Sequence, residues 1–174
     1  MAFEKTNHIL TIRQKNEERF LRTRPADFDF STSTEKERRE LIEAMYLLMR
    51  KANGIGLSAN QIGLDARMFV AELPVKNRKP KRYAIFNPEI IAASKETIAI
   101  EEGCLSIPET YGTVVRPKEV TLIGFDKHQK PVKIVAKGLL ARIFQHETDH
   151  LNGALFIDKA TNIHKSAEEH DAEL

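Results

Sequence analysis

Residues 139–150 read LLARIFQHETDH, and this stretch decides the fold. Apolar residues recur through it at helical spacing, and the stripe that they form continues into His146 and His150. Residues four apart share one face of an α-helix, so both imidazoles can bind one metal ion while Glu147 stands beside it as a general base. Gly153 is placed to end the helix. The stretch therefore predicts a buried helix that carries an HExxH metal motif.

The motif needs a third ligand, because catalytic metals usually have about three protein ligands and one open position. The best candidate is Cys104, the chain's single cysteine, in the segment EEGCLS at 101–106. A free cysteine is more often a small buried hydrophobe. Here the polar neighbours do not suit a core position, and Gly103 permits unusual backbone geometry. The remaining histidines are expected at the surface: His8, His128, His164 and His170.

Composition is typical of a globular domain, with 174 residues of which 41% are hydrophobic and 30% charged. We expect one domain over residues 1–174, in which 159–174 form a short polar tail. The net charge of +2 gives no basis for nucleic-acid binding. No apolar run reaches the length of a membrane span. Since the start lacks a secretory hydrophobic region and one cysteine cannot form an internal disulfide, we expect a cytoplasmic protein.

Upstream of the motif, the sequence predicts one amphipathic helix and then β-strands. The helix is expected over residues 34–53, where Thr34 and Glu37 have capping-box spacing. Five β-prone runs follow: Met68–Glu72, Tyr83–Phe86, Thr97–Glu101, Glu119–Phe125 and Pro131–Ala136. The last two flank a turn at 126–130 and predict a hairpin. The lysine-rich segment 76–82 predicts an exposed loop.

A glycine-rich segment, GIGLSANQ at 54–61, follows the first helix. It lacks both the GxGxxG pattern and the Lys-Ser/Thr ending of phosphate-binding loops, so phosphate binding is a weak interpretation. Its glycines are better explained by a close approach of the backbone to a substrate. Gln61 would offer a side-chain amide donor there.

Together, GIGLSANQ, EGCLS and QHETDHLNG resemble the three signature motifs of the peptide deformylases, in the family's order and with similar intervals. The resemblance covers residues 21–158. It implies an α+β fold, with antiparallel β-sheets packed around a central helix carrying the HExxH motif and an N-terminal amphipathic helix. It also implies a metal-dependent hydrolase that removes the formyl group from N-formylmethionine at the start of nascent polypeptides.

Matched residue by residue, the resemblance also implies roles in the site. The metal ligands would be Cys104, His146 and His150, with Glu147 as the catalytic carboxylate. The oxyanion donors would be Gln61 and the Leu105 backbone N–H. Substrate contacts are expected from Gly56, Arg116, Leu139 and Ile143. We expect the aliphatic stem of Arg142 to line the methionine pocket while its guanidinium reaches solvent.

The cofactor implied is one divalent metal ion, with Fe²⁺ as the physiological ion. One thiolate and two imidazoles also suit Zn²⁺, Ni²⁺ or Co²⁺. The partners implied are N-formylmethionyl nascent peptides. The substrate also suggests the ribosome, although no segment identifies it, and neither nucleic acid nor a membrane is expected to bind directly.

Two other classes remain open. An HExxH-type zinc endopeptidase usually takes its third ligand downstream of the motif, where this chain offers only Glu168 and Glu169 in a polar tail. A structural metal domain would favour four protein ligands and would leave Glu147 unexplained. Formyl-Met-Ala and a blocked internal peptide would separate the three classes as substrates.

Overall fold

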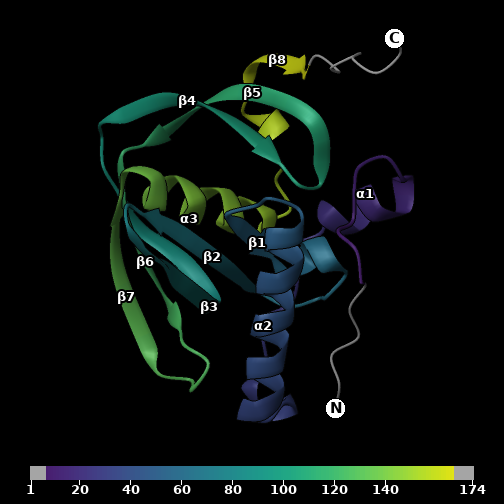
Figure 1. The fold of residues 1–174 in the computed structure, drawn as a ribbon, viewed down its shortest axis with the longest axis vertical. Helices are drawn as coiled ribbons and strands as arrows, with labels where there is room; N and C mark the ends of the chain where they lie inside the picture. The colour runs from purple at the N-terminus through teal and green to yellow at the C-terminus, as the bar shows by residue number, and fades with distance from the viewer. Residues whose placement is uncertain (1–6, 167–174) are drawn as a thin grey trace.

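The computed structural model describes residues 7–166, in which helices and antiparallel strands follow one another (Figure 1). The α-helices are α1 (Lys15–Leu21), α2 (Glu35–Lys51) and α3 (Gly138–His150). The strands are β1 (Gly56–Ser58), β2 (Met68–Val75), β3 (Arg78–Ala93), β4 (Thr97–Cys104), β5 (Ile107–Pro117), β6 (Glu119–Phe125), β7 (Pro131–Lys137) and β8 (Thr161–Lys165). Short 3-10 helices cover Phe30–Thr32, Ala59–Ile62 and Phe156–Asp158.

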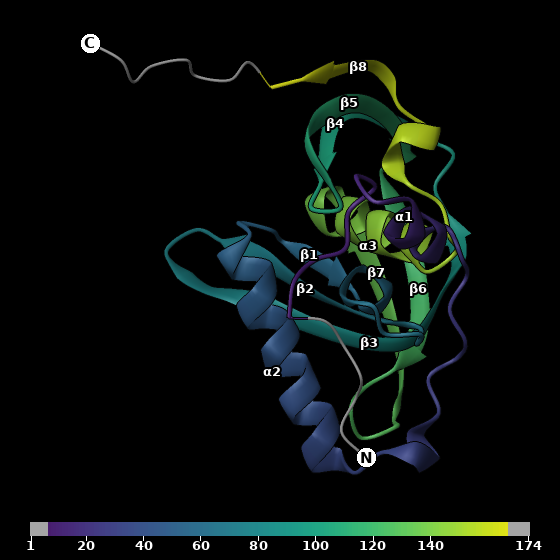
Figure 2. The same cartoon turned by 90° about the vertical axis from the view of Figure 1, so that its right-hand side faces the viewer.

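Two antiparallel sheets enclose α3. The larger has the order β1-β2-β3-β6-β7, and the smaller has the order β4-β5-β8. Both views place α3 between the sheets, with α2 beside β1 and β2 (Figures 1 and 2). The predicted α+β class with antiparallel sheets is confirmed. Because β1 is an edge strand, one side of its backbone faces away from the sheet.

Apolar packing holds α3 against the larger sheet. Phe144 is fully buried among residues of this sheet, including Phe69 and Leu122. Replacing such a buried phenylalanine by alanine typically costs about 3–5 kcal/mol of unfolding free energy. A second cluster forms where Met45 and Met49 of α2 pack on the opposite face of the same sheet, since Met68 and Val70 of this cluster alternate along β2 with Phe69 and Ala71 of the first. The helix that carries the motif is thus fixed from one side by a packed core.

The first long helix begins as its sequence predicts. The Thr34 side chain accepts a hydrogen bond from the Glu37 N–H, and the Glu37 carboxylate accepts one from the Thr34 N–H. These two bonds satisfy backbone donors that the first turn leaves free. The helix ends at Lys51, two residues before the predicted end.

The expectation of a loop over residues 76–82 is wrong. Strands β2 and β3 continue as a hairpin whose turn is only Lys76–Asn77, with Asn77 in the left-handed region at a φ of 58°. The backbone ladder extends beyond the core, so it needs no apolar side chains there. At its base, buried Glu72 accepts hydrogen bonds from Arg50 and Arg82.

Other elements were not predicted from the sequence. Helix α1 is short and β1 is only three residues long. Strand β5 was missed although it contains the β-prone residues Thr113, Val114 and Val115. Part of the expected polar tail is ordered, because β8 pairs with β5, although its side chains are exposed. His170 and the rest of the tail lie outside the described residues. Over residues 7–166, no helix is both long and apolar enough to cross a membrane.

Candidate active site

Three side chains from two distant segments converge between the sheets. Cys104 ends β4, whereas His146 and His150 lie one turn apart on α3. The Cys104 Sγ is 3.1 Å from the His150 Nε2, and one ligand atom from each of the three residues lies within 4.8 Å of the others. No other group of this kind occurs in residues 7–166. The three residues expected to bind a metal are therefore brought together.

The charge of this cluster suits a divalent cation. Burial opposes ionisation of Cys104, but His150 and His146 outweigh it and lower the pKa of the thiol to about 5. Burial likewise opposes charge on His146, yet Cys104 and Glu102 raise its pKa well above the usual range. A thiolate is thus available at neutral pH, and thiolate with imidazole is a donor set that zinc and iron accept.

Glu147 lies beside this cluster with its carboxylate buried. Burial raises its pKa to about 7, although His146 and His150 act in the opposite direction. Its Oε2 is buried and has no hydrogen-bond partner among the described residues. Gly56 packs directly against it, since a Cβ there would lie 2.8 Å from the Glu147 Cδ. A carboxylate with such a pKa is suited to general base chemistry near neutral pH.

Gln61 has a fixed amide orientation. Its Oε1 accepts hydrogen bonds from the Ser58 N–H at 2.9 Å and the Ser58 Oγ at 3.0 Å. Its Nε2 therefore faces the cluster, 3.7 Å from the Cys104 Sγ and 3.1 Å from the Ser106 Oγ. Leu105 follows Cys104 in the turn after β4 and lines the same cavity.

The cluster opens into a cavity with apolar walls. Leu139 and Ile143 line it from α3, and Gly56 lines it from the edge strand β1. Ile98 and Ile100 of β4 also line it, and they were missed by sequence analysis. Their i, i+2 spacing on a predicted strand is the signal that could have found them. An edge strand beside an apolar cavity can hold an extended peptide with one apolar side chain inserted.

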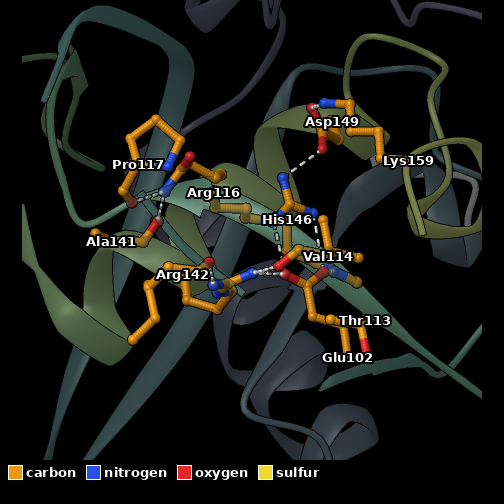
Figure 3. A network of polar contacts seen from close by, with 12 residues as sticks. Glu102, Thr113, Val114, Arg116, Pro117, Ala141, Arg142, His146, Asp149 and Lys159 are labelled. Atoms are coloured by element: carbon orange, nitrogen blue, oxygen red, sulfur yellow. Dashed lines mark hydrogen bonds and ion pairs between the residues drawn. The ribbon is translucent and has the colours of Figure 1, made fainter. Parts of the chain in front are cut away.

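Behind the cluster lies a network of buried charges centred on Glu102 (Figure 3). Its Oε2 accepts a hydrogen bond from the His146 Nδ1 at 2.9 Å, which leaves the His146 Nε2 for a metal. Arg116 donates from Nε to Oε1 at 2.6 Å and from Nη2 to Oε2 at 2.9 Å. Burial alone would raise the pKa of Glu102, but Arg116 and His146 hold it well below the usual range. In the sequence, Glu102 stands out only as a polar neighbour of Cys104, and no local pattern indicates these contacts.

The position of Arg116 does not support the expected substrate contact. Its guanidinium is buried between Glu102 and Asp149, and Asp149 is in turn paired with Lys159. Arg116 is also not among the residues that line the cavity. Two carboxylates hold the guanidinium away from the cavity.

The expectation for Arg142 is half right. Its side chain lines the cavity, but its guanidinium is buried and does not reach solvent. Three acceptors hold it inside: the Glu102 carboxylate and the carbonyls of Val114 and Ile98. These hydrogen bonds offset the cost of removing the guanidinium from water.

Comparisons with known proteins give a consistent result. Residues 8–166 match the family model described as Polypeptide deformylase. A peptide deformylase of Parasynechococcus marenigrum is 45% identical over 127 residues, which are 73% of this chain and 63% of the relative. The match therefore spans less than two thirds of that relative's length.

Two solved structures share the fold. A probable peptide deformylase from Synechococcus phage S-SSM7 has a TM-score of 0.78 at 34% identity, and the match covers 91% of this chain and 99% of that one. A class I type b peptide deformylase from Acinetobacter baumannii with Met-Ala-Ser bound has a TM-score of 0.77 at 29% identity, covering 88% and 98%. The family model matches nearly the whole chain, and the motif residues converge around one cavity. This chain therefore belongs to the polypeptide deformylase family.

Proposed function

We propose that this chain is a metal-dependent hydrolase that removes the formyl group from N-terminal formylmethionine of nascent polypeptides. One observation carries the proposal: the Cys104, His146 and His150 cluster lies beside the buried carboxylate of Glu147, at the end of an apolar cavity. Three ligands leave a coordination position open, which favours catalysis over a closed structural site.

The cavity suggests how the substrate lies. An extended peptide can add to the free edge of β1 at Gly56, with its first side chain in the cavity between Ile143 and the isoleucines of β4. Methionine fits such walls because it is unbranched and apolar. The formyl group would then reach the carboxylate of Glu147. That the A. baumannii relative was solved with Met-Ala-Ser bound supports this substrate class.

The residues divide the chemistry among them. Cys104, His146 and His150 would hold a divalent metal, which supplies Lewis acidity and lowers the pKa of water when bound. Glu147 takes a proton from the attacking water and passes it to the leaving amine. The Gln61 Nε2 and the Leu105 N–H stabilise the oxyanion that forms on the formyl oxygen.

Substrate choice tests the function. Hydrolysis of formyl-Met-Ala with release of formate, and no cleavage of a blocked internal peptide, is the expected result. Cleavage of the internal peptide would instead support the zinc endopeptidase. Turnover of neither substrate by metal-loaded protein would support a structural site. A cytoplasmic location and contact with the ribosome remain predictions from the substrate class.

We propose Fe²⁺ as the physiological metal. An open Fe²⁺ site beside a thiolate is exposed to oxygen, and Cys104 can itself be oxidised. Matched Fe²⁺, Ni²⁺ and Zn²⁺ preparations should therefore differ: the Fe²⁺ form is expected to be fast but to lose activity in air, while the Ni²⁺ form persists. A Zn²⁺ form as active as fresh Fe²⁺ protein, or an Fe²⁺ form that air leaves unchanged, would favour zinc.

A further inference from the structure

We propose that Arg142 is a positioning residue for the metal centre, acting through Glu102 on His146. The inference rests on the proposed function, because it concerns how the metal ligands are held. Arg142 lies one helical turn before His146, so both side chains project from the same face of α3. Figure 3 shows both of them directed at the Glu102 carboxylate.

The contacts of Arg142 join three elements. Its Nη1 donates to the Glu102 Oε1 at 2.7 Å and to the Val114 carbonyl at 2.8 Å. Its Nη2 donates to the Ile98 carbonyl at 2.8 Å. One planar guanidinium thus links α3 to both β4 and β5, and only an arginine offers donors in this fixed arrangement. It determines where Glu102 lies relative to the helix that carries His146.

Arg116 cannot replace Arg142 in this role. The charge of Arg116 is shared between Glu102 and Asp149, and it comes from the small sheet rather than from α3. Arg142 has its one ion pair with Glu102 within residues 7–166. Without Arg142, α3 would contact the Glu102 carboxylate directly only through His146, and otherwise only through Arg116 and its pair with Asp149. The Glu102 carboxylate that accepts from His146 would then lose its second direct anchor on the same helix.

The effect should appear in how tightly the metal is held. Loss of an outer partner of a metal-bound histidine typically lowers metal affinity or activity by about 10–100-fold. Arg142 is one hydrogen bond further from the metal site than Glu102, the direct partner of His146. We therefore expect Arg142→Met to speed metal release by about 10-fold, the lower end of that range. Methionine keeps an apolar stem at the cavity, so KM should change less than kcat.

Gln145 provides a matched control. It lies on the same helix, is equally buried, and its Nε2 donates to the Pro117 carbonyl of β5 at 3.0 Å and to the Ala141 carbonyl at 2.9 Å. Gln145→Leu therefore removes a polar link between α3 and the small sheet without touching Glu102. A loss of general stability should affect both variants, whereas a loss of positioning should affect only Arg142→Met.

The experiment uses the full chain loaded with Co²⁺, whose thiolate absorption band reports the metal site. Release to a chelator is followed for wild type, Arg142→Met, Arg142→Lys and Gln145→Leu, together with thermal unfolding of each metal-free protein. We expect fast release in Arg142→Met, an intermediate rate in Arg142→Lys, which keeps the charge and one donor direction, and a wild-type rate in Gln145→Leu.

Equal release rates in wild type and Arg142→Met would overturn the inference and leave the proposed function intact. Equal acceleration in Arg142→Met and Gln145→Leu would also overturn it, since the effect would then be general loosening. If Arg142→Met does not fold, the rate of metal release from Arg142→Lys is the test instead. A wild-type release rate in Arg142→Lys would refute the positioning role of Arg142. A wild-type chain that takes up no Co²⁺ would instead refute the proposed metal centre itself.

Discussion

Replacing Gly56 by alanine should disable the site while leaving most of the fold intact. The glycine lies on the edge strand β1, and its missing side chain makes room for the Glu147 carboxylate. A Cβ there would lie 2.8 Å from the Glu147 Cδ and 3.1 Å from its Cγ, and closer still to Oε1. Real Cβ atoms essentially never approach within 3.0 Å, so the carboxylate must move.

The expected losses of stability and activity in Gly56→Ala follow from the displacement of the Glu147 carboxylate. Inserting a methyl group into a packed site typically costs about 1–3 kcal/mol of unfolding free energy, because neighbours are forced from their preferred positions. For a chain of this size, each kcal/mol lowers Tm by about 2–4 °C. Displacing a general base lowers the rate of the catalysed reaction by about 10²–10⁴-fold. This corresponds to about 3–5 kcal/mol of activation free energy. The loss of activity should therefore far exceed the loss of stability.

Gly112 supplies the control. A Cβ at this position would lie 2.9 Å from the Ala160 Cβ, in the small sheet and away from Glu147. Formate release from formyl-Met-Ala and thermal unfolding are measured for wild type, Gly56→Ala and Gly112→Ala. Both variants should lose stability, but only Gly56→Ala should lose kcat. Near wild-type kcat in a folded Gly56→Ala protein would refute the claim that this close contact positions Glu147.

Three further outcomes test single residues. Glu147→Gln keeps the shape but cannot accept a proton, so metal content should stay unchanged while kcat falls by about 10²–10⁴-fold; metal loss would make Glu147 a ligand. Gln61→Leu should lower kcat by about 10²–10³-fold, as for one oxyanion donor, and an unchanged kcat would remove it from the mechanism. Hydrogen bonds from Arg50, and then Arg82, lower the pKa of Glu72 below its ordinary 4.5 despite burial. Its contribution to stability is therefore full above pH 4.5 and is lost as the pH falls through the lower folded value, so urea unfolding of Glu72→Gln should show a weaker acid dependence than wild type.

Much of the site could be predicted because it depends on local spacing. His146 and His150 share a helix face by periodicity alone, and Glu147 between them has a chemical reason to be there. Cys104 could be proposed because a lone cysteine between polar neighbours fits a core poorly. The spacing of residues within each segment could not show that the two segments meet, because that contact belongs to the tertiary structure.

Elements without a buried face were harder to predict. The extended β2–β3 hairpin carries charged residues on both faces beyond the core, so no alternation marks it as a strand. Strand β8 has the same difficulty, since every one of its side chains is exposed. In both, backbone hydrogen bonds to a neighbouring strand decide the conformation, and these bonds leave no trace in side-chain patterning.

The charge network explains why the support of the site is hidden from sequence. Glu102 is one of two adjacent glutamates, and its partners Arg116 and Arg142 lie 14 and 40 residues away. In isolation each of these residues is expected at the surface, because burying a single charge is costly. Burial becomes acceptable only when all the partners arrive together, with every donor and acceptor paired. The arrangement in which the small sheet closes over α3 completes this pairing, and the same arrangement places Cys104 opposite His150. The fold and the candidate metal centre thus depend on one set of contacts.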